Sequence, residues 1–265
     1  MEISSIHNPR VKNAVRLRDR RHRHKQARIL IDGARELRRA IGAGLKMVEV
    51  FVCRSECRTP DAQRVLEMLD TSGAEVLEVT QAVLEKLEFG HRSEGVLGVA
   101  ETPQRKLADL GLPDCPLVAV LEGAEKPGNV GAVLRSADGA GVSALIVADG
   151  GTDLYNPNAI RASLGTIFTM PLAAATTAET IDWLRSHDLA VYAARVDGAV
   201  PYTEADLRRP AAIVLGSEAA GLTAAWSGDW LTAVRLPMQG TADSLNVSAT
   251  AAVLFYEALR QRGVG

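Results

Sequence analysis

A chain of 265 residues is long for one domain and comfortable for two, either of which could bury a hydrophobic core. Apolar residues at 47% and charged residues at 23% exclude a chain that is disordered throughout its length. No apolar run approaches the roughly 18–20 residues that span a bilayer. The basic N-terminus lacks the apolar segment of a signal peptide, so we expect a protein of the cytoplasm.

The formal net charge of −2 conceals a basic head on an acidic body. Residues 1–39 hold twelve Lys and Arg against four Asp and Glu, a balance of +8, and the remaining residues balance at −10. The pattern from Asn8 to Arg28 is helical, and like charges at helical spacing repel unless phosphates neutralise them. This segment could be a basic helix exposed to solvent, but the interpretation that we favour is that it binds nucleic acid. The expected RNA contacts are Arg10, Lys12, Arg18, Arg20, Arg21 and Arg23.

Strands and helices alternate through the front of the chain. Apolar strands are predicted at 29–31, 47–53, 74–79 and 95–100. Helices are predicted between them, at 33–43, 61–69 and 81–87. This alternation indicates a small α/β domain over residues 1–102. The stretch 103–115, which is polar at its ends and contains prolines, indicates a linker.

The alternation resumes after the linker. Strands are predicted at 116–123, 143–149, 189–196, 211–216 and 234–238, with a short strand end at 167–171. Helices are predicted at 129–139, 159–164, 180–186 and 245–262. Nearly continuous apolar strands between helices indicate a parallel sheet covered on both faces. Residues 116–265 therefore predict a second α/β domain, with its ligand site at the carboxyl ends of the strands.

The three cysteines, Cys53, Cys57 and Cys115, give no pattern of metal ligands. Cys53 and Cys57 lack the second Cys or His pair that would complete a zinc site. We expect reduced structural thiols and no metal.

Two loops that follow predicted strands are polar or glycine-rich. In the first, Asn129 can cap the helix that carries Arg135, although a helix cap and a surface arginine would be the plainer interpretation. In the second, a buried strand runs into Gly216 and Glu218. Glycine permits close backbone approach, and a glutamate at a strand exit suits a helix cap or a charge that faces a site.

The third such loop precedes the last helix. Ser244 or Asp243 can cap that helix. Asn246 is expected in its first turn, where an amide in an otherwise apolar helix needs hydrogen-bond partners. All three loops therefore carry polar groups toward one edge of the predicted sheet.

These loops resemble, in order, the three motifs of the SpoU/TrmH family of RNA ribose methyltransferases. The matching pieces are N-x-G-A-x-x-R at 129–135, LGSE-x-x-G-L at 215–222, and P-M-x(6)-LNVS at 237–248. The front of the chain is similar to the ribosomal-protein-like substrate-binding domain of that family, through HNPRVK at 7–12 and GVLGVAE at 95–101.

The resemblance implies a parallel sheet whose C-terminal segment is threaded into a trefoil knot, which is a rare exception to the rule against knots. It implies S-adenosylmethionine as the cofactor, and a homodimer with the site near its interface. The residues expected to hold the cofactor, largely through main-chain groups, are Ala194, Arg195, Leu215, Gly216, Leu236, Met238, Ser244 and Leu245.

The implied reaction moves a methyl group in line from a sulfonium to a ribose 2′-hydroxyl. The implied catalytic residues are Arg135, Asn129, Glu218, Ser244 and Asn246. The family's base has been sought at the position of Arg135, but a guanidinium has a pKa above ~12 and does not readily lose a proton. We therefore expect Arg135 to bind phosphate and to stabilise alkoxide character, while phosphate or water accepts the proton.

The other implied residues have supporting roles. Asn129 is expected to orient Arg135 or the ribose, and Glu218 to anchor that network. Ser244 and Asn246 are expected to order the knot and to contact substrate or cofactor. Arg161 matches a second arginine of part of the family and is expected to bind RNA phosphate from the partner subunit.

Two other classes of protein stay open. A nucleotide- or NAD-binding enzyme would need a glycine-rich turn between its first strand and helix, whereas Gly139 and Gly141 follow a helix and precede a strand. A non-catalytic RNA-binding factor could keep the fold, but the retained Arg135 and Asn246 favour an enzyme. Base methylation is a further alternative, and the arginine motif favours ribose. The two-domain layout favours ribosomal RNA over transfer RNA.

Overall fold

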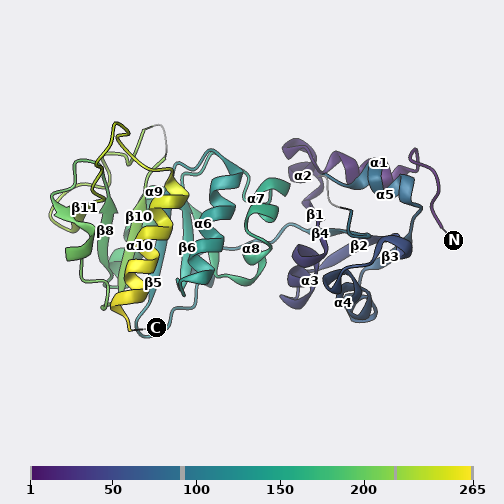
Figure 1. Cartoon of the computed structure of the whole chain (residues 1–265), viewed down its shortest axis with the longest axis horizontal. Coiled ribbons are helices and arrows are strands. Elements are labelled where there is room, and N and C mark those ends of the chain that lie inside the picture. Colours follow the sequence, from purple (N-terminus) through teal and green to yellow (C-terminus); the bar gives the residue numbers. More distant parts are fainter. Residues whose placement is uncertain (1, 90–92, 218–219, 264–265) are drawn as a thin grey trace. The chain divides into compact units, whose positions relative to one another are not determined.

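The computed structural model describes residues 2–89, 93–217 and 220–263 (Figure 1). The chain forms two compact units. The first unit comprises Met1–Gln104 and Asp153–Thr169, and the second comprises Arg105–Thr152 and Met170–Gly265. The segment Asp153–Thr169 thus packs with the front of the chain, although it lies inside the stretch 116–265.

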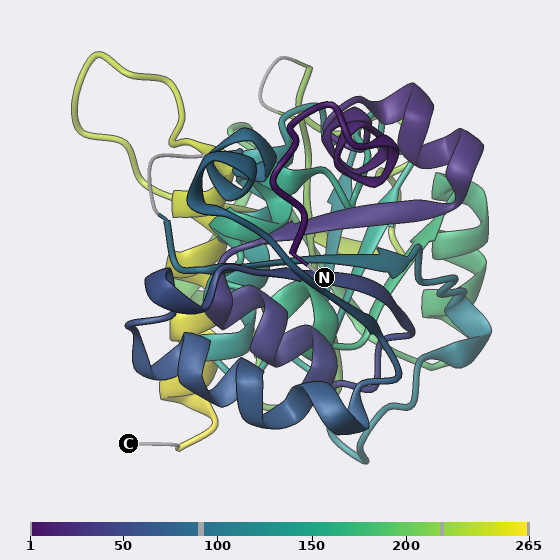
Figure 2. The ribbon, with the colours of Figure 1, turned by 90° about the vertical axis from the view of Figure 1, so that its right-hand side faces the viewer.

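The first unit is built on a four-stranded sheet. Its strands, in spatial order, are β1 (Arg28–Asp32), β4 (Val96–Glu101), β2 (Met47–Val52) and β3 (Glu75–Glu78). β4 is antiparallel to both of its neighbours, and β2 and β3 are parallel. Figure 2 shows helices on both faces of this sheet, with α3 (Ala34–Gly42) and α4 (Pro60–Met68) opposite α1 (Pro9–Arg16) and α5 (Gln81–Leu87).

The basic head forms two helices where the sequence pattern predicted one. α1 begins after Asn8, whose side-chain oxygen accepts a 2.9 Å hydrogen bond from the Arg10 amide. α2 (Arg20–Gln26) begins after Asp19, whose carboxylate accepts a 2.7 Å hydrogen bond from the Arg21 amide. An aspartate with extended backbone is a preferred helix cap, so Asp19 starts a new helix inside the arginine run.

The second unit is built on a seven-stranded sheet in which the described strands pair in parallel. Its strands, in spatial order, are β7 (Leu172–Ala175), β6 (Ala144–Ala148), β5 (Leu117–Glu122), β10 (Ala211–Leu215), β8 (Ala190–Ala194), β11 (Leu231–Arg235) and β9 (Val200–Pro201). β5, β6 and β10 are buried along their whole length, which confirms the parallel sheet predicted from continuous apolar strands.

Three longer helices cover this sheet. Leu184 of α9 (Thr177–Ser186) packs with Val118 and Val120 of β5. α6 (Pro127–Gly139) and α10 (Val247–Gln261) pack against each other (Figure 1). Short 3-10 helices complete the elements, η1 and η2 in the first unit and η3 and η4 in the second: Arg54–Glu56, Leu69–Thr71, Leu107–Asp109 and Tyr202–Glu204.

The short strand end predicted at 167–171 was wrong. The chain forms α7 (Pro157–Ala162) and α8 (Thr166–Thr169) there, and β7 begins only at Leu172. The Ser163 and Thr166 hydroxyls donate to the carbonyls three residues earlier, at 2.8 and 2.9 Å. A short apolar run does not by itself distinguish a buried helix from a strand, which explains the error.

Two predicted helix caps were also wrong. α6 starts at Pro127, so Asn129 lies inside its first turn. Proline has no amide hydrogen to leave unpaired at that position. α10 is capped by Asn246 rather than by Ser244 or Asp243, since the Asn246 side chain accepts a 2.9 Å hydrogen bond from the Ser248 amide.

Neither a membrane-spanning helix nor a metal-binding cluster occurs among the described residues. None of their helices is long and apolar enough to cross a membrane. None of their His, Cys, Asp and Glu side chains form a group of three or more that could hold a metal ion. Cys53 and Cys57 are buried free thiols, and burial raises the pKa of Cys57 to about 11.

Candidate functional site

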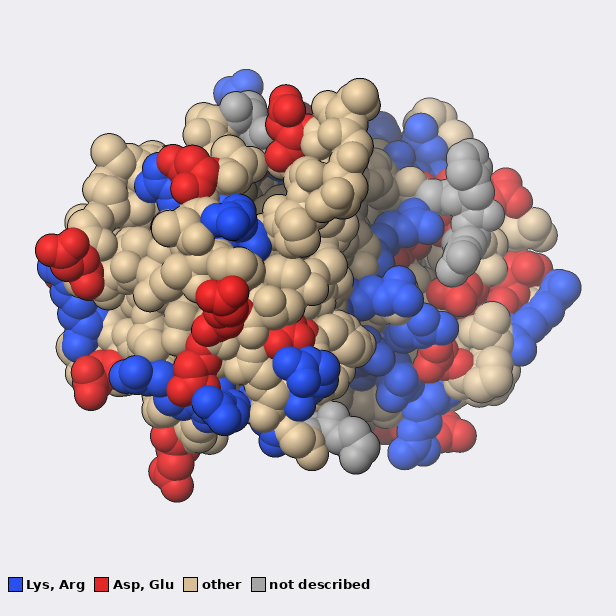
Figure 3. Space-filling view, turned by 60° about the vertical axis from the view of Figure 1, so that its left-hand side comes forward, with Lys and Arg blue, Asp and Glu red and all other residues tan. Residues whose placement is uncertain are grey.

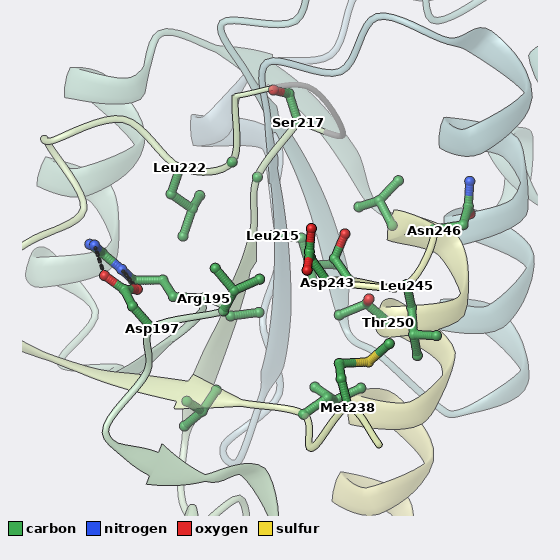
Figure 4. Close-up of a pocket in the computed structure, with 18 of the residues that line it drawn as sticks. Arg195, Asp197, Leu215, Ser217, Leu222, Met238, Asp243, Leu245, Asn246 and Thr250 are labelled. Atoms are coloured by element: carbon green, nitrogen blue, oxygen red, sulfur yellow. Dashed lines mark hydrogen bonds and ion pairs between the residues drawn. The ribbon is translucent and has the colours of Figure 1, made fainter. Parts of the chain in front are cut away.

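A pocket with a volume of about 640 Å³ opens at the carboxyl ends of β8, β10 and β11 (Figure 4). This main pocket is lined by the end of β8, by the loop after β10 and by the connection from β11 to α10. All the residues expected to hold the cofactor line it: Ala194, Arg195, Leu215, Gly216, Leu236, Met238, Ser244 and Leu245. The volume lies within the ~300–1,000 Å³ of small-molecule sites.

The loop after β10 forms one wall of the main pocket through its described residues 216–217 and 220–222, and these residues together with Thr223 are named the β10 loop. Ser217 and Gly221 exchange two backbone hydrogen bonds, of 3.1 and 3.0 Å, that close the loop on itself. A Cβ on Gly216 would lie 2.3 Å from the Gly221 carbonyl carbon, so only glycine fits there. The glycines of this motif therefore shape a pocket wall.

Both charged and apolar side chains line the main pocket. Arg195 forms a two-pronged ion pair with Asp197, at 2.8 and 2.9 Å, and these hydrogen bonds lower the pKa of Asp197 (Figure 4). Asp243 extends into the middle of the view between apolar neighbours such as Leu215 and Met238. No side chain in the described ranges pairs with the Asp243 carboxylate. The main pocket thus combines apolar side chains with the solvent-exposed carboxylate of Asp243.

A second pocket, of about 190 Å³, adjoins the main one. The two share Gly216, Ser217 and Val247 as lining residues. Its remaining walls come from the end of β5 and the start of α6, including Lys126 and the half-buried Asn129. A ligand in the main pocket and a ligand in the second pocket would therefore meet across the β10 loop.

The predicted catalytic residues fall into three groups. Ser244 and Asn246 line the main pocket, and Asn129 lines the second. Arg135 is exposed on α6 and lines neither of them. It lies six residues beyond Asn129, which is about 9 Å along a helix axis at ~1.5 Å per residue. Glu218 lies outside the described residues.

Some Lys and Arg side chains of the basic head are exposed to solvent, and others form ion pairs or hydrogen bonds within the first unit. Lys12, Arg20 and Arg21 are exposed. Arg10 forms a 2.6 Å ion pair with Glu75, and Arg18 donates to the carbonyls of Lys86 and Glu88 at 2.8 and 2.5 Å. Figure 3 shows Lys and Arg side chains crowded on the visible part of the first unit, at the right of the view, with Asp and Glu among them.

Arg23 requires a correction. Its side chain is 3% exposed and forms a 2.7 Å ion pair with Asp153, so it has almost no surface for a phosphate. Its Nη1 also donates to the carbonyls of Leu17 and Arg18, at 2.6 and 2.8 Å. Arg23 is therefore an internal connector of the first unit and not an RNA contact.

Arg161 lies in the first unit, on α7. Its Nη1 is 3.5 Å from the Asp32 carboxylate, and its side chain is 31% exposed. Burial raises the pKa of Asp32, and the Arg161 charge opposes that rise. Arg161 is therefore partly exposed and partly engaged by Asp32.

Sequence reasoning missed two site residues. Asp243 was considered only as a helix cap, and it lines the main pocket as a charged group. Glu122, at the end of β5, is buried and hydrogen-bonded to the end of the β10 loop. A glutamate that ends an apolar strand was the available signal, because such a carboxylate needs buried partners.

Comparison with known proteins gives two matches to family models. The SpoU rRNA Methylase family matches residues 116–256. The MRM3-like substrate binding domain matches residues 8–98. The two matched ranges contain the main pocket and the basic head respectively.

Individual proteins match along most of the chain. A solved RNA 2′-O ribose methyltransferase is 46% identical with a TM-score of 0.86, and 99% of each chain is covered. An AdoMet-bound rRNA methyltransferase from Sinorhizobium meliloti is 29% identical with a TM-score of 0.86, covering 98% of this chain and 97% of that one. The 23S rRNA (guanosine-2′-O-)-methyltransferase RlmB of Bordetella pertussis is 33% identical, over 81% of this chain and 89% of its own length.

Proposed function

Because this chain belongs to the SpoU rRNA methylase family, we propose that it transfers a methyl group from S-adenosylmethionine to a ribose 2′-hydroxyl of ribosomal RNA. The observation that carries the proposal is the main pocket, where the residues expected to hold the cofactor converge. It is formed at the carboxyl ends of parallel strands, where ligands of such sheets bind.

The main pocket fits S-adenosylmethionine in size and chemistry. Its apolar side chains, including Leu215, Leu222 and Met238, suit an adenine ring. Asp243 supplies a negative charge for a ligand that carries a positive sulfonium. When bound, the cofactor supplies an electrophilic methyl group, and the S. meliloti relative is AdoMet-bound.

The target ribose occupies the second pocket in this proposal. That pocket shares Gly216, Ser217 and Val247 with the main one, so a hydroxyl there would face the cofactor across a short boundary. Asn129 would orient the ribose, and Ser244 and Asn246 would contact substrate or cofactor. Arg135 lines neither pocket, but its long side chain would reach the phosphate next to the ribose and stabilise the developing negative charge, with phosphate or water accepting the proton. Holding the reacting atoms in line is the main catalytic task.

Asp243→Asn is expected to weaken S-adenosylmethionine binding by about tenfold, because it removes a charge that attracts the sulfonium. S-adenosylhomocysteine has a neutral sulfide, so its affinity should change by less than about twofold. Titration calorimetry with both ligands measures the ratio, and Asp229→Asn, which removes an exposed carboxylate outside the main pocket, is the matched control. Equal losses for the two ligands would contradict the assignment of Asp243 to the sulfonium.

Methyl transfer itself is tested with radiolabelled S-adenosylmethionine and ribosomal RNA from cells that lack this enzyme. We expect label in the RNA, recovered after alkaline hydrolysis in alkali-resistant dinucleotides, since a 2′-O-methyl group blocks cleavage of the adjacent phosphodiester. Label recovered only in mononucleotides would indicate base methylation, and no label would contradict the proposed substrate.

The first unit is proposed to hold the RNA through Arg10, Lys12, Arg18, Arg20, Arg21 and Arg161. Arg20→Gln with Arg21→Gln should reduce the slope of log K against log salt by about 1.5, because each phosphate contact contributes ~0.7–0.9. Lys46→Gln with Arg64→Gln changes the charge equally at exposed sites elsewhere in the unit. Binding measured from 50 to 200 mM salt gives the slope, and equal slopes for the two double variants would argue against this surface.

We also propose a homodimer, a trefoil knot in the C-terminal segment and a cytoplasmic location.

The homodimer is supported by exposed apolar side chains on and beside α10. Leu245, Val253 and Tyr256 are 42%, 37% and 52% exposed. Large apolar side chains exposed next to a pocket favour a surface that a second copy covers. Sedimentation equilibrium should give twice the mass of one chain, and a monomer at micromolar concentration would contradict the dimer.

A further inference from the structure

Glu122 ends β5 with a carboxylate that is buried and fully hydrogen-bonded. Glu122 is only 2% exposed. Oε1 accepts from the hydroxyls of Thr177 and Thr223, both at 2.8 Å, and Oε2 accepts from the Thr223 amide at 2.8 Å. Burying a carboxylate costs free energy unless hydrogen-bond donors compensate the lost hydration. These hydrogen bonds therefore join three segments, which are the end of β5, the start of α9 and the end of the β10 loop.

Thr223 connects the Glu122 carboxylate to the β10 loop. Thr223 directly follows Leu222, which lines the main pocket, and two backbone hydrogen bonds join Gly221 to Ser217 at the start of the loop. The start of the loop lies beside Gly123, the residue after β5, because a Cβ on Gly123 would lie 3.4 Å from the Ser217 Cβ. Glu122 therefore binds the end of the loop, and Gly123 lies next to its start.

Thr177 connects the Glu122 carboxylate to helix α9, outside the main pocket. Thr177 is the first residue of α9, and its amide donates to the Asp149 carboxylate at 2.9 Å. Neither Thr177 nor Glu122 lines the main pocket. The two threonine hydroxyls thus make matched contacts to one carboxylate oxygen. Neither threonine lines the main pocket, and both line a third pocket beside Glu122, but only Thr223 is bonded in sequence to a main-pocket residue, Leu222.

We infer that Glu122 is a positioning residue for the cofactor. Through Thr223 it fixes the β10 loop, and the fixed loop sets the affinity for S-adenosylmethionine without any contact between Glu122 and the cofactor. This inference rests on the proposed function, which assigns the main pocket to that cofactor.

The matched pair Thr223→Val and Thr177→Val tests the inference, because each removes one hydroxyl from the same carboxylate. Thr223→Val is expected to weaken S-adenosylmethionine binding by about tenfold, the cost of one hydrogen bond to a charged group. Thr177→Val should change the affinity by less than about twofold while lowering the melting temperature comparably. Titration calorimetry and thermal unfolding of the full chain give both quantities.

Kinetics and a rescue variant separate positioning from general damage. Thr223→Val should raise KM for S-adenosylmethionine with little change in kcat, since the loss is in cofactor binding. Thr223→Ser restores the hydroxyl and should restore the affinity. Glu122→Gln keeps the size of the side chain but cannot accept all three hydrogen bonds, so it should follow Thr223→Val and not Thr177→Val.

Two results would overturn the inference: equal affinity losses in the two valine variants, or normal affinity in Thr223→Val. The unaltered chain is titrated first. If it does not bind S-adenosylmethionine, the proposed function fails. If it binds and the valine variants behave alike, only the role of Glu122 fails.

Discussion

Arg135→Ala is expected to lower the rate of methyl transfer by about 10²–10³-fold, the typical cost of removing one preorganised group that stabilises developing negative charge. Cofactor affinity should stay within about twofold, because Arg135 is exposed on α6 and does not line the main pocket. Single-turnover transfer from labelled cofactor measures the rate, and calorimetry measures the affinity.

Two further variants define the role of this side chain. Arg135→Lys keeps the positive charge, so it should retain more activity than Arg135→Ala if the role is electrostatic. Arg208→Ala removes an exposed arginine that pairs with Asp206, and it should leave transfer unchanged. Near-normal turnover in Arg135→Ala would remove Arg135 from the mechanism.

Arg23→Ala is expected to destabilise the first unit by about 3–5 kcal/mol, because it leaves the mostly buried Asp153 carboxylate without its partner. It also removes the donors to the Leu17 and Arg18 carbonyls that end the first helix of the basic head. Urea unfolding measures the loss. Hydrogen exchange should locate it in α2 and in the segment Asp153–Thr169.

The ion pair itself is isolated with a double variant. Arg23→Met with Asp153→Leu replaces both charges by apolar groups, and it should be more stable than either single variant. Single variants within about 0.5 kcal/mol of the unaltered chain would show that the pair does not hold this segment in place.

The sequence predicted the sheet of the second unit well. Its strands are apolar along their length, and β5, β6 and β10 are buried as that pattern requires. The cofactor residues were implied by the family resemblance, and their convergence at one edge of the sheet agrees with the rule that strand ends of a parallel sheet meet there. The pattern of apolar residues was sufficient to predict a strand wherever the segment was long and buried along its whole length.

The failures share a physical cause, which is dependence on distant residues or on local backbone geometry. Arg23 was predicted as a surface cation, and its burial depends on Asp153, 130 positions away. The run 167–171 is too short for its apolar pattern to separate helix from strand. The caps of α6 and α10 depend on where the helix begins, and neighbouring polar residues could equally have served.

Asp243 and Glu122 show the same limit at the site. A carboxylate near the start of a helix or at the end of a strand has an ordinary structural use. Only the arrangement of the chain shows that one carboxylate enters the main pocket and the other holds the pocket wall.

The most direct test of the central claim is mass spectrometry of nucleosides from ribosomal RNA incubated with the enzyme and S-adenosylmethionine carrying a deuterated methyl group. Transfer to ribose 2′-oxygen should give a nucleoside heavier by the labelled methyl, with the label on the sugar fragment and an unmodified base. A labelled base fragment, or RNA without label although the chain binds the cofactor, would contradict ribose 2′-O-methylation.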